Sequence, residues 1–274
     1  MFILSRPRLF LPTLLLLSFL PGTLAQQSDS TKQTNRHSLY GGLGFGSDMT
    51  YSGYSLSGSR PYYSADLLYS YKRSWTAAFM VYHLADTQTA LAFYDFTLAY
   101  RKTFNSWWDA GASLAAYFTA KDLRDLYFGN FAYMSVSAGL DWRLLYTRVV
   151  YSTILDDSQT RYFQIKNSHY FSTRDFWKDK AFVDFNPTAN MLWGKRYDIS
   201  KTNTEETENG PVEYPEYSTS FGLLDAEFSL PISFNYGNMT LEVEPLYNLP
   251  IYKDPDFPAR EGMLIFINLY YKIL

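Results

Sequence analysis

The chain has 274 residues, of which 47% are hydrophobic, 19% aromatic and only 19% charged. An aromatic content this high excludes a disordered chain, because those side chains need to be buried. The absence of cysteine from the sequence excludes disulfides, thiolate zinc sites, iron–sulfur clusters and thiol nucleophiles. Basic residues (24) and acidic residues (27) nearly balance, so the charge indicates no nucleic-acid partner.

The first 25 residues are typical of a secretory signal peptide. Two arginines and no acid precede an apolar stretch at 9–20, and Thr23-Leu24-Ala25 has the small-x-small pattern of a cleavage site. As a helix this stretch would span about 18 Å, against about 30 Å for a membrane core, which favours cleavage over an anchor. We predict a signal peptide at 1–25, a polar flexible leader at 26–36 and a single folded domain at 37–274.

Beyond the signal peptide, hydrophobic residues recur with a period of two. No apolar run there reaches 18 residues, which excludes membrane-spanning helices. Alternation predicts β-strands, and segments of 9–13 residues exceed the usual strand length of about 5–6. That length suits a tilted strand that crosses a bilayer. Twelve strands are expected, at 38–46, 61–71, 75–83, 90–101, 107–119, 130–142, 145–155, 160–172, 181–194, 218–234, 238–247 and 263–273.

The connections between these segments alternate in length. Tight turns are expected at 72–74, 102–106, 143–144 and 236–237. Longer, more polar loops are expected at 47–60, 84–89, 120–129, 156–159, 195–217 and 248–262. The fold predicted is therefore all-β: a closed antiparallel transmembrane β-barrel of about 12 strands, with short periplasmic turns and long outer loops.

Two alternatives to this fold stay open at the level of sequence. Region 156–180 alternates poorly, so ten strands remain an alternative to twelve. A soluble β-sandwich or lipocalin-like barrel would show the same alternation. Long strands, tyrosines and tryptophans near the strand ends, and the signal peptide favour the transmembrane barrel.

Two segments resemble known bacterial barrels. The last eleven residues, Leu264 to Leu274, resemble the terminal strand that barrel-assembly machinery reads, although those chains usually end on Phe. Residues 46–57 resemble the first strand and loop of an exported barrel family with no assigned function. Its pattern is Ser-Asp, an aromatic, Arg-Gly and Ser-x-Ser, and Ser52 stands here in place of the Arg. The Tyr- and Asn-rich composition with a long acidic loop resembles barrels of the Bacteroidota. These resemblances imply a Gram-negative cell outer membrane, with membrane lipid and the assembly machinery as partners.

Some barrels are lipid-cleaving enzymes, and these place a His base and a Ser nucleophile two positions apart on one strand. The three histidines, His37, His83 and His169, have Leu39, Ala85 and Phe171 at that position. Ser168 adjoins His169 but would point to the opposite face of a strand. We therefore predict that the protein is not an enzyme, which leaves a membrane-embedded lipid hydrolase as a disfavoured third function.

Charged residues within the strands are expected to face the barrel lumen, since Lys or Arg on the lipid face costs about 2–4 kcal/mol at mid-membrane. The expected lumen-lining residues are Asp66, Asp95, Arg101, Asp141, Arg148, Asp184, Asp225, Glu227, Glu242 and Glu244. The acidic loop 195–217 lacks the Asp-x-Asp-x-Asp-Gly spacing of a calcium loop, so neither a metal nor a cofactor is expected. Acidic walls favour a narrow porin-like pathway for small, mildly cationic or neutral solutes. The alternative is a closed structural or surface-binding barrel without transport.

Overall fold

The computed structural model describes residues 36–124, 129–155, 160–178, 180–207, 210–253 and 259–274. The expected signal peptide (1–25) lies outside the described residues, as does the expected leader except Arg36. No helix within the described ranges has the length and apolarity needed to span a membrane.

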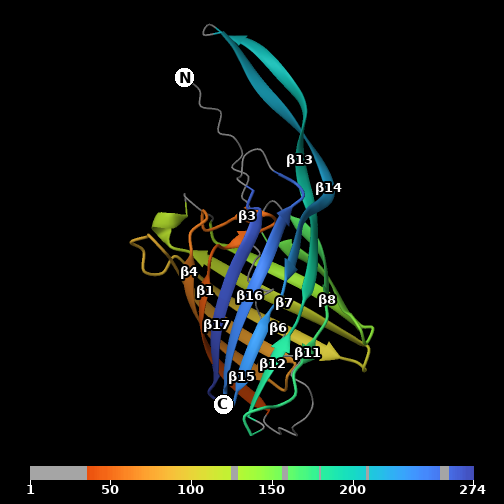
Figure 1. The fold of residues 1–274 in the computed structure, drawn as a ribbon. Helices are drawn as coiled ribbons and strands as arrows, with labels where there is room; N and C mark the ends of the chain where they lie inside the picture. Colours follow the sequence, from red (N-terminus) through yellow and green to blue (C-terminus); the bar gives the residue numbers. More distant parts are fainter. Residues whose placement is uncertain (1–35, 125–128, 156–159, 179, 208–209, 254–258) are drawn as a thin grey trace.

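Within the described residues, twelve strands form a closed antiparallel ring (Figure 1). Each strand of the ring pairs with the ring strands before and after it in the chain. The first strand, β1, also pairs with the last, β17, from Tyr40↔Lys272 to Gly46↔Phe266, and this pairing closes the barrel. The ring confirms the prediction of twelve strands rather than ten. Its members are β1 (His37–Gly46), β4 (Tyr62–Tyr71), β5 (Trp75–Leu84), β6 (Phe93–Thr103), β7 (Trp108–Thr119), β8 (Phe131–Asp141), β9 (Tyr146–Ile154), β10 (Arg161–Ser168), β13 (Thr188–Thr207), β14 (Gly210–Ser229), β16 (Met239–Pro250) and β17 (Gly262–Lys272).

Three neighbouring strands are interrupted near their short-turn ends. β11 (Phe171–Ser172), β12 (Ala181–Phe185) and β15 (Ile232–Tyr236) continue the lines of β10, β13 and β14 past these breaks. Pro187 and Pro231 lie at two of the breaks. Proline has no backbone N–H to donate to the neighbouring strand, so the ladder is interrupted there. The breaks explain the poor alternation of 156–180: a strand is present there, but it is divided.

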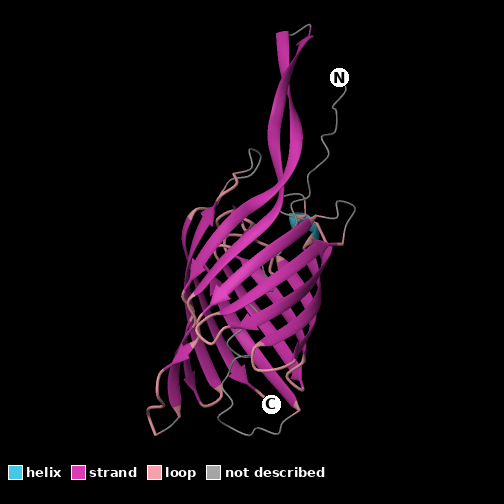
Figure 2. Ribbon diagram, turned by 90° about the vertical axis from the view of Figure 1, so that its right-hand side faces the viewer, coloured by secondary structure: helices cyan, strands magenta, loops and turns pink. Residues whose placement is uncertain are grey.

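The segment 195–217 is a β-hairpin, so the prediction of a loop there was wrong. β13 and β14 continue their pairing beyond the barrel, as far as Thr207↔Gly210, and Figure 2 shows this hairpin projecting past the mouth of the ring. The run of glutamates suggested a solvated loop. The interspersed threonines, valine and tyrosines have strand propensity, and the ladder begun in the barrel wall extends through them.

The expected loops 47–60 and 120–129 also contain regular structure. Thr50–Tyr51 (β2) pairs with Tyr54–Ser55 (β3) around Ser52 and Gly53, whose φ angles are 53° and 84°. Positive φ at both central residues is the geometry of a type I′ hairpin turn. A short 3₁₀ helix, η1 (Lys121–Leu123), lies in the second segment.

The outer surface of the barrel is apolar. On β17, Met263, Ile265, Ile267, Leu269 and Tyr271 are exposed and alternate with the inward-facing residues of the strand. Exposed tryptophans lie at the short-turn end, at Trp75, Trp107, Trp142 and Trp177. A continuous apolar belt with aromatic residues at its edge suits lipid rather than water, which argues against the soluble alternative.

Candidate functional site in the barrel interior

The structure places nine of the ten expected lumen residues on the face opposite the apolar belt. Asp95, Asp184, Asp225 and Glu242 are buried, whereas Asp66, Arg101, Arg148, Glu227 and Glu244 are half-buried. Asp141 differs, because it is exposed at the short-turn end and its carboxylate accepts the Arg143 backbone N–H at 2.7 Å. It caps a turn there.

One glycine on β1 makes room for an acidic side chain of the neighbouring strand. Gly42 is the cross-strand partner of Asp66, and the Asp66 carboxylate occupies the space where a Cβ at Gly42 would lie. The carboxylates of Asp66 and Asp95 interact electrostatically. The Tyr82 hydroxyl donates to Asp95 Oδ2 at 3.2 Å, so this carboxylate has a partner although it is buried.

Strand register brings further polar residues into a row that the sequence alone could not reveal. Arg148, Lys166, Asn190, Glu227 and Asn248 are successive cross-strand partners from β9 to β16. Asn190 Nδ2 donates to Glu227 Oε2 at 2.7 Å. The row therefore changes from basic on β9 and β10 to acidic on β14.

A β-bulge alters the expected alternation on β14. The pairing of β13 with β14 shifts by one residue between Leu192 and Trp193, so Leu224 is left without an opposing residue. Leu224 and Asp225 are both buried as a result, whereas strict alternation would place Leu224 on the outer face.

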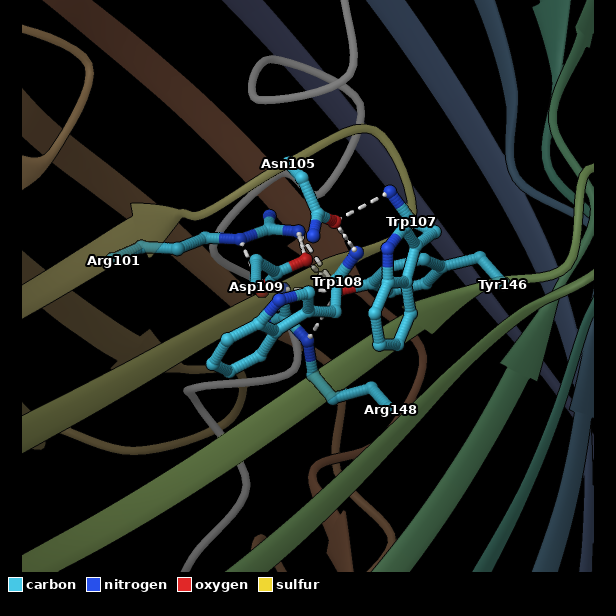
Figure 3. A network of polar contacts seen from close by, with 7 residues as sticks. All are labelled: Arg101, Asn105, Trp107, Trp108, Asp109, Tyr146 and Arg148. Atoms are coloured by element: carbon cyan, nitrogen blue, oxygen red, sulfur yellow. Dashed lines mark hydrogen bonds and ion pairs between the residues drawn. The ribbon is translucent and has the colours of Figure 1, made fainter.

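At the short-turn end of the interior, Arg101, Asp109, Tyr146 and Arg148 form a basic cluster (Figure 3). Arg101 Nε and Nη2 donate to the two oxygens of Asp109 at 2.8 and 2.7 Å, a bidentate pair. The Tyr146 hydroxyl donates to Asp109 Oδ2 at 2.8 Å and accepts from Arg148 Nη2 at 3.0 Å. Two guanidinium groups thus surround one carboxylate, which leaves one positive charge in excess. Both arginines were expected in the interior from the sequence, whereas Tyr146 was not expected as their partner.

Glycine and asparagine shape the surroundings of this cluster. A Cβ at Gly139 would lie 2.7 Å from Asp109 Oδ2 and closer still to the Tyr146 hydroxyl, so only glycine fits there. Asn105 Oδ1 accepts the backbone N–H groups of Trp107 and Trp108, both at 3.0 Å, and so fixes the turn that leads into β7.

Residues 48–57, named here the plug segment, fill the outer end of the interior. Met49 and Leu56 belong to one buried apolar cluster with inward-facing residues from strands around the ring. Only the barrel interior can bring residues from so many strands into contact. The wall contributes Tyr62, Tyr82, Leu84, Phe93, Tyr117, Tyr133, Ile154, Tyr162, Leu192, Leu224, Leu246, Leu264 and Phe266.

Asp48 organises the plug segment. Its side chain is 1% exposed and accepts hydrogen bonds from the Ser55 and Ser57 hydroxyls at 2.6 and 2.7 Å. Arg260 Nε donates to its second oxygen at 2.9 Å. The Ser-Asp and Ser-x-Ser elements of the family resemblance therefore meet at one buried carboxylate, which gives the motif a structural role.

The plug segment is also held by the neighbouring part of the wall. The Arg260 backbone N–H donates to Gly53 O at 2.7 Å, and Tyr54 forms a bridge with Ala259. The Gly53 backbone N–H donates to the Asp225 carboxylate on β14. The segment leaves β1 and reaches β14, which lies three strands away around the ring.

The histidines bond to backbone carbonyls or to tyrosine. His83 Nδ1 lies 3.2 Å from the carbonyl oxygens of Thr89 and Ala90, and His169 Nδ1 contacts Leu144 O. His37 Nδ1 lies 2.6 Å from the Tyr69 hydroxyl. In the part of the chain that the structure describes, no three His, Cys, Asp or Glu side chains form a metal-binding group.

Comparisons with known proteins bear on the fold. No family model and no curated protein matches the sequence. LpxR from Salmonella typhimurium has a similar structure, with a TM-score of 0.51 at 6% identity over 85% of this chain and 99% of that one. An outer membrane channel from Pseudomonas putida F1 gives 0.48 at 11% identity over 90% and 99%. KdgM porin gives 0.47 at 8% identity over 86% and 98%. At these identities the likeness concerns architecture alone: a closed barrel of the outer-membrane type.

Proposed function

We propose that the protein lies in a bacterial outer membrane and provides a narrow porin-like pathway for small cationic or neutral solutes. One observation carries this proposal. Besides Asp109 and Asp184 near the short-turn end, six carboxylates face the interior, and Lys166 interacts electrostatically with two of them, Glu227 and Glu244. The six are Asp66, Asp95, Asp225, Glu227, Glu242 and Glu244.

Charge along the interior explains why the expected selectivity is mild. Acidic side chains in a narrow, poorly solvated passage attract cations and repel anions. The basic cluster at the short-turn end has the opposite sign, since Arg101 and Arg148 share the single carboxylate of Asp109. A solute therefore meets both signs, with carboxylates in excess.

Planar-bilayer recordings test this proposal. We expect a small conductance whose reversal potential in a KCl gradient indicates a preference for cations. Asp225→Asn combined with Glu227→Gln should reduce that preference, whereas Glu261→Gln, which changes an exposed carboxylate in the 251–261 segment, should leave it unchanged. Absence of conductance from both the native protein and a variant with a loosened plug segment would overturn the proposal.

A closed, surface-binding barrel is the second candidate, and two observations favour it. The apolar cluster fills the outer end of the interior, and the β13–β14 hairpin extends beyond the barrel, where a partner could reach it (Figure 2). Deletion of 202–214 separates the candidates, because a binding role should suffer more than conductance does.

We also propose that the protein is not an acyl hydrolase. Support comes from the histidines, whose described ring-nitrogen hydrogen bonds are with backbone carbonyls and a tyrosine hydroxyl rather than with serine. Purified protein should release no fatty acid from phospholipid or lipid A, with or without Ca²⁺. Release that disappears in His169→Ala would show that this proposal is wrong.

Biogenesis and family are inferred from the sequence. We infer a cleaved signal peptide, contact with outer-membrane lipid and assembly machinery, and membership of the uncharacterised Bacteroidota-like barrel family. Mass spectrometry of the mature chain should find Gln26 at its N-terminus. An alignment of family members should show Asp48 varying together with Ser55, Ser57 and Arg260, because these four groups share hydrogen bonds.

A further inference from the structure

Three buried side chains in the outer part of the interior hold oxygen atoms without hydrogen-bond partners. Asn190, Asp225 and Asn248 are 8%, 2% and 0% exposed, and the Oδ1 atom of each is unpaired. A buried polar atom without a partner costs about 1–3 kcal/mol, so such atoms usually indicate a missing ligand, ion or water.

The three side chains surround Glu227. Asn190 on β13 and Asn248 on β16 are both cross-strand partners of Glu227 on β14, and Asp225 precedes it by two residues on the same face. The amide nitrogens are already used: Asn190 Nδ2 donates to Glu227 at 2.7 Å and Asn248 Nδ2 donates to Arg260 O at 2.5 Å. The unused atoms are oxygens, which can bind only a hydrogen-bond donor or a cation.

The charge at this place favours a cation. Asp225 and Glu227 interact electrostatically, as do Glu227 and Glu244, while Lys166 is the base that interacts electrostatically with Glu227 and Glu244. Counted as ionised, three carboxylates and one ammonium carry a formal charge of −2, which one divalent ion would balance. Hard divalent ions, Ca²⁺ above all, take carboxylate and Asn carbonyl oxygens as ligands.

We propose that Asn190, Asp225, Glu227 and Asn248 form a binding site for a hard divalent cation beneath the plug segment. Two of the four side chains are amides, so the site differs from clusters made only of His, Cys, Asp and Glu. Its residues come from three strands joined by register, and for that reason no sequence motif marks it. Gly53 of the plug segment donates its N–H to Asp225, so the bound ion would tie the plug segment to the wall.

The proposal goes beyond the pathway, and binding can be measured whether or not the barrel conducts. Detergent-solubilised protein, freed of metal with a chelator, is titrated with CaCl₂ in a calorimeter. We expect one site with a dissociation constant of roughly 0.1–1 mM, as in extracellular calcium modules. Asp225→Asn with Glu227→Gln should abolish binding, and Asn248→Leu should weaken it about tenfold or more, as loss of a supporting group does at metal sites.

Three controls separate the site from other acidic regions. Asp95→Asn removes a buried interior carboxylate that is already bonded to Tyr82, and it should leave binding unchanged. Deletion of 202–214 removes acids of the hairpin and should also leave it unchanged. Folding of every variant is checked by its heat-dependent gel mobility, and Asn190→Leu replaces any variant that does not fold.

Each outcome is informative. Binding that survives the double substitution, or that disappears with the hairpin deletion, would overturn the proposal. Failure to bind Ca²⁺ up to 10 mM, roughly tenfold above the expected range, would also overturn it and indicate that waters satisfy the unpaired oxygens. Methylammonium that binds while Ca²⁺ does not would assign the site to an organic cation and contradict the metal proposal.

Discussion

The two ends of the barrel interior have different chemistry. At the outer end, the plug segment and inward-facing side chains from around the ring form one buried apolar cluster. At the short-turn end, the basic cluster of Arg101, Asp109, Tyr146 and Arg148 is polar, and its two arginine side chains are about 30% exposed. On the proposed pathway, passage would therefore be most restricted at the outer end, where packed apolar side chains fill the interior.

The difference arises from what each end places on its inward-facing positions. Near the loops these positions hold Leu84, Ile154 and Leu264, all fully or almost fully buried. Near the turns they hold Asp109, Gly139 and Arg148, and the missing side chain of Gly139 leaves space for its charged neighbours. The plug segment contributes Met49 and Leu56 to the first environment only.

The largest effect is expected from Asp48→Leu, which removes the carboxylate that organises the plug segment. Ser55, Ser57 and Arg260 would lose a shared partner, and each hydrogen bond to a charged group contributes roughly 1.5–3 kcal/mol. The plug segment should detach and the conductance should rise several-fold in bilayer recordings. Unchanged conductance with an unchanged denaturation midpoint would place the resistance elsewhere.

The second prediction concerns the other end, where Gly139→Leu should disrupt the basic cluster. A side chain at this position meets Tyr146 and Asp109, and overpacking of this kind costs about 1–3 kcal/mol. The denaturation midpoint should fall, whereas Ala138→Leu, the exposed neighbour on the lipid face, should leave it unchanged. Equal effects from both substitutions would mean that the cluster has no special sensitivity.

Much of the barrel could be predicted from sequence, because a strand that faces lipid on one side and a polar interior on the other has a clear period of two. The strand at 160–172 was harder to predict, since its break at His169 and Tyr170 interrupts the period that identifies it. The hairpin at 195–217 was missed because its glutamates resemble a solvated loop, although the pairing of β13 with β14 continues through them.

The candidate site was less accessible to sequence reasoning, because register and loop placement decide it. Asn190, Glu227 and Asn248 are far apart in the chain and become neighbours only through the pairing of three strands. The bulge that turns Leu224 inward has no signal in the alternation. Asp48 was noticed through a resemblance, but its partner Arg260 is 212 residues away.

The third prediction tests the sign of charge at the short-turn end. Arg101→Gln removes a bidentate partner of Asp109, at a cost of about 1.5–3 kcal/mol for a hydrogen bond to a charged group, while Arg148 stays near. The interior becomes more negative, so the reversal potential should shift further toward cations. Lys102→Gln, an exposed neighbour, is the matched control. A shift toward anions would contradict the charge argument.

The smallest effect is expected at the 251–261 segment, which contributes to two ion pairs of opposite character. Lys253 and Glu261 lie 3.3 Å apart with side chains 63% and 48% exposed, whereas the Arg260–Asp48 pair joins side chains 33% and 1% exposed. Exposed pairs contribute about 0–1 kcal/mol, because water and salt screen them and two long side chains lose freedom. Lys253→Gln should therefore leave conductance and the denaturation midpoint nearly unchanged, and any residual effect should vanish in 1 M salt, where charges are screened within about 3 Å. A double-mutant cycle of Lys253 and Glu261, run beside one of Asp48 and Arg260, measures both couplings in the same background. Equal coupling energies would contradict the argument that burial, rather than the mere presence of opposite charges, holds the plug segment in place.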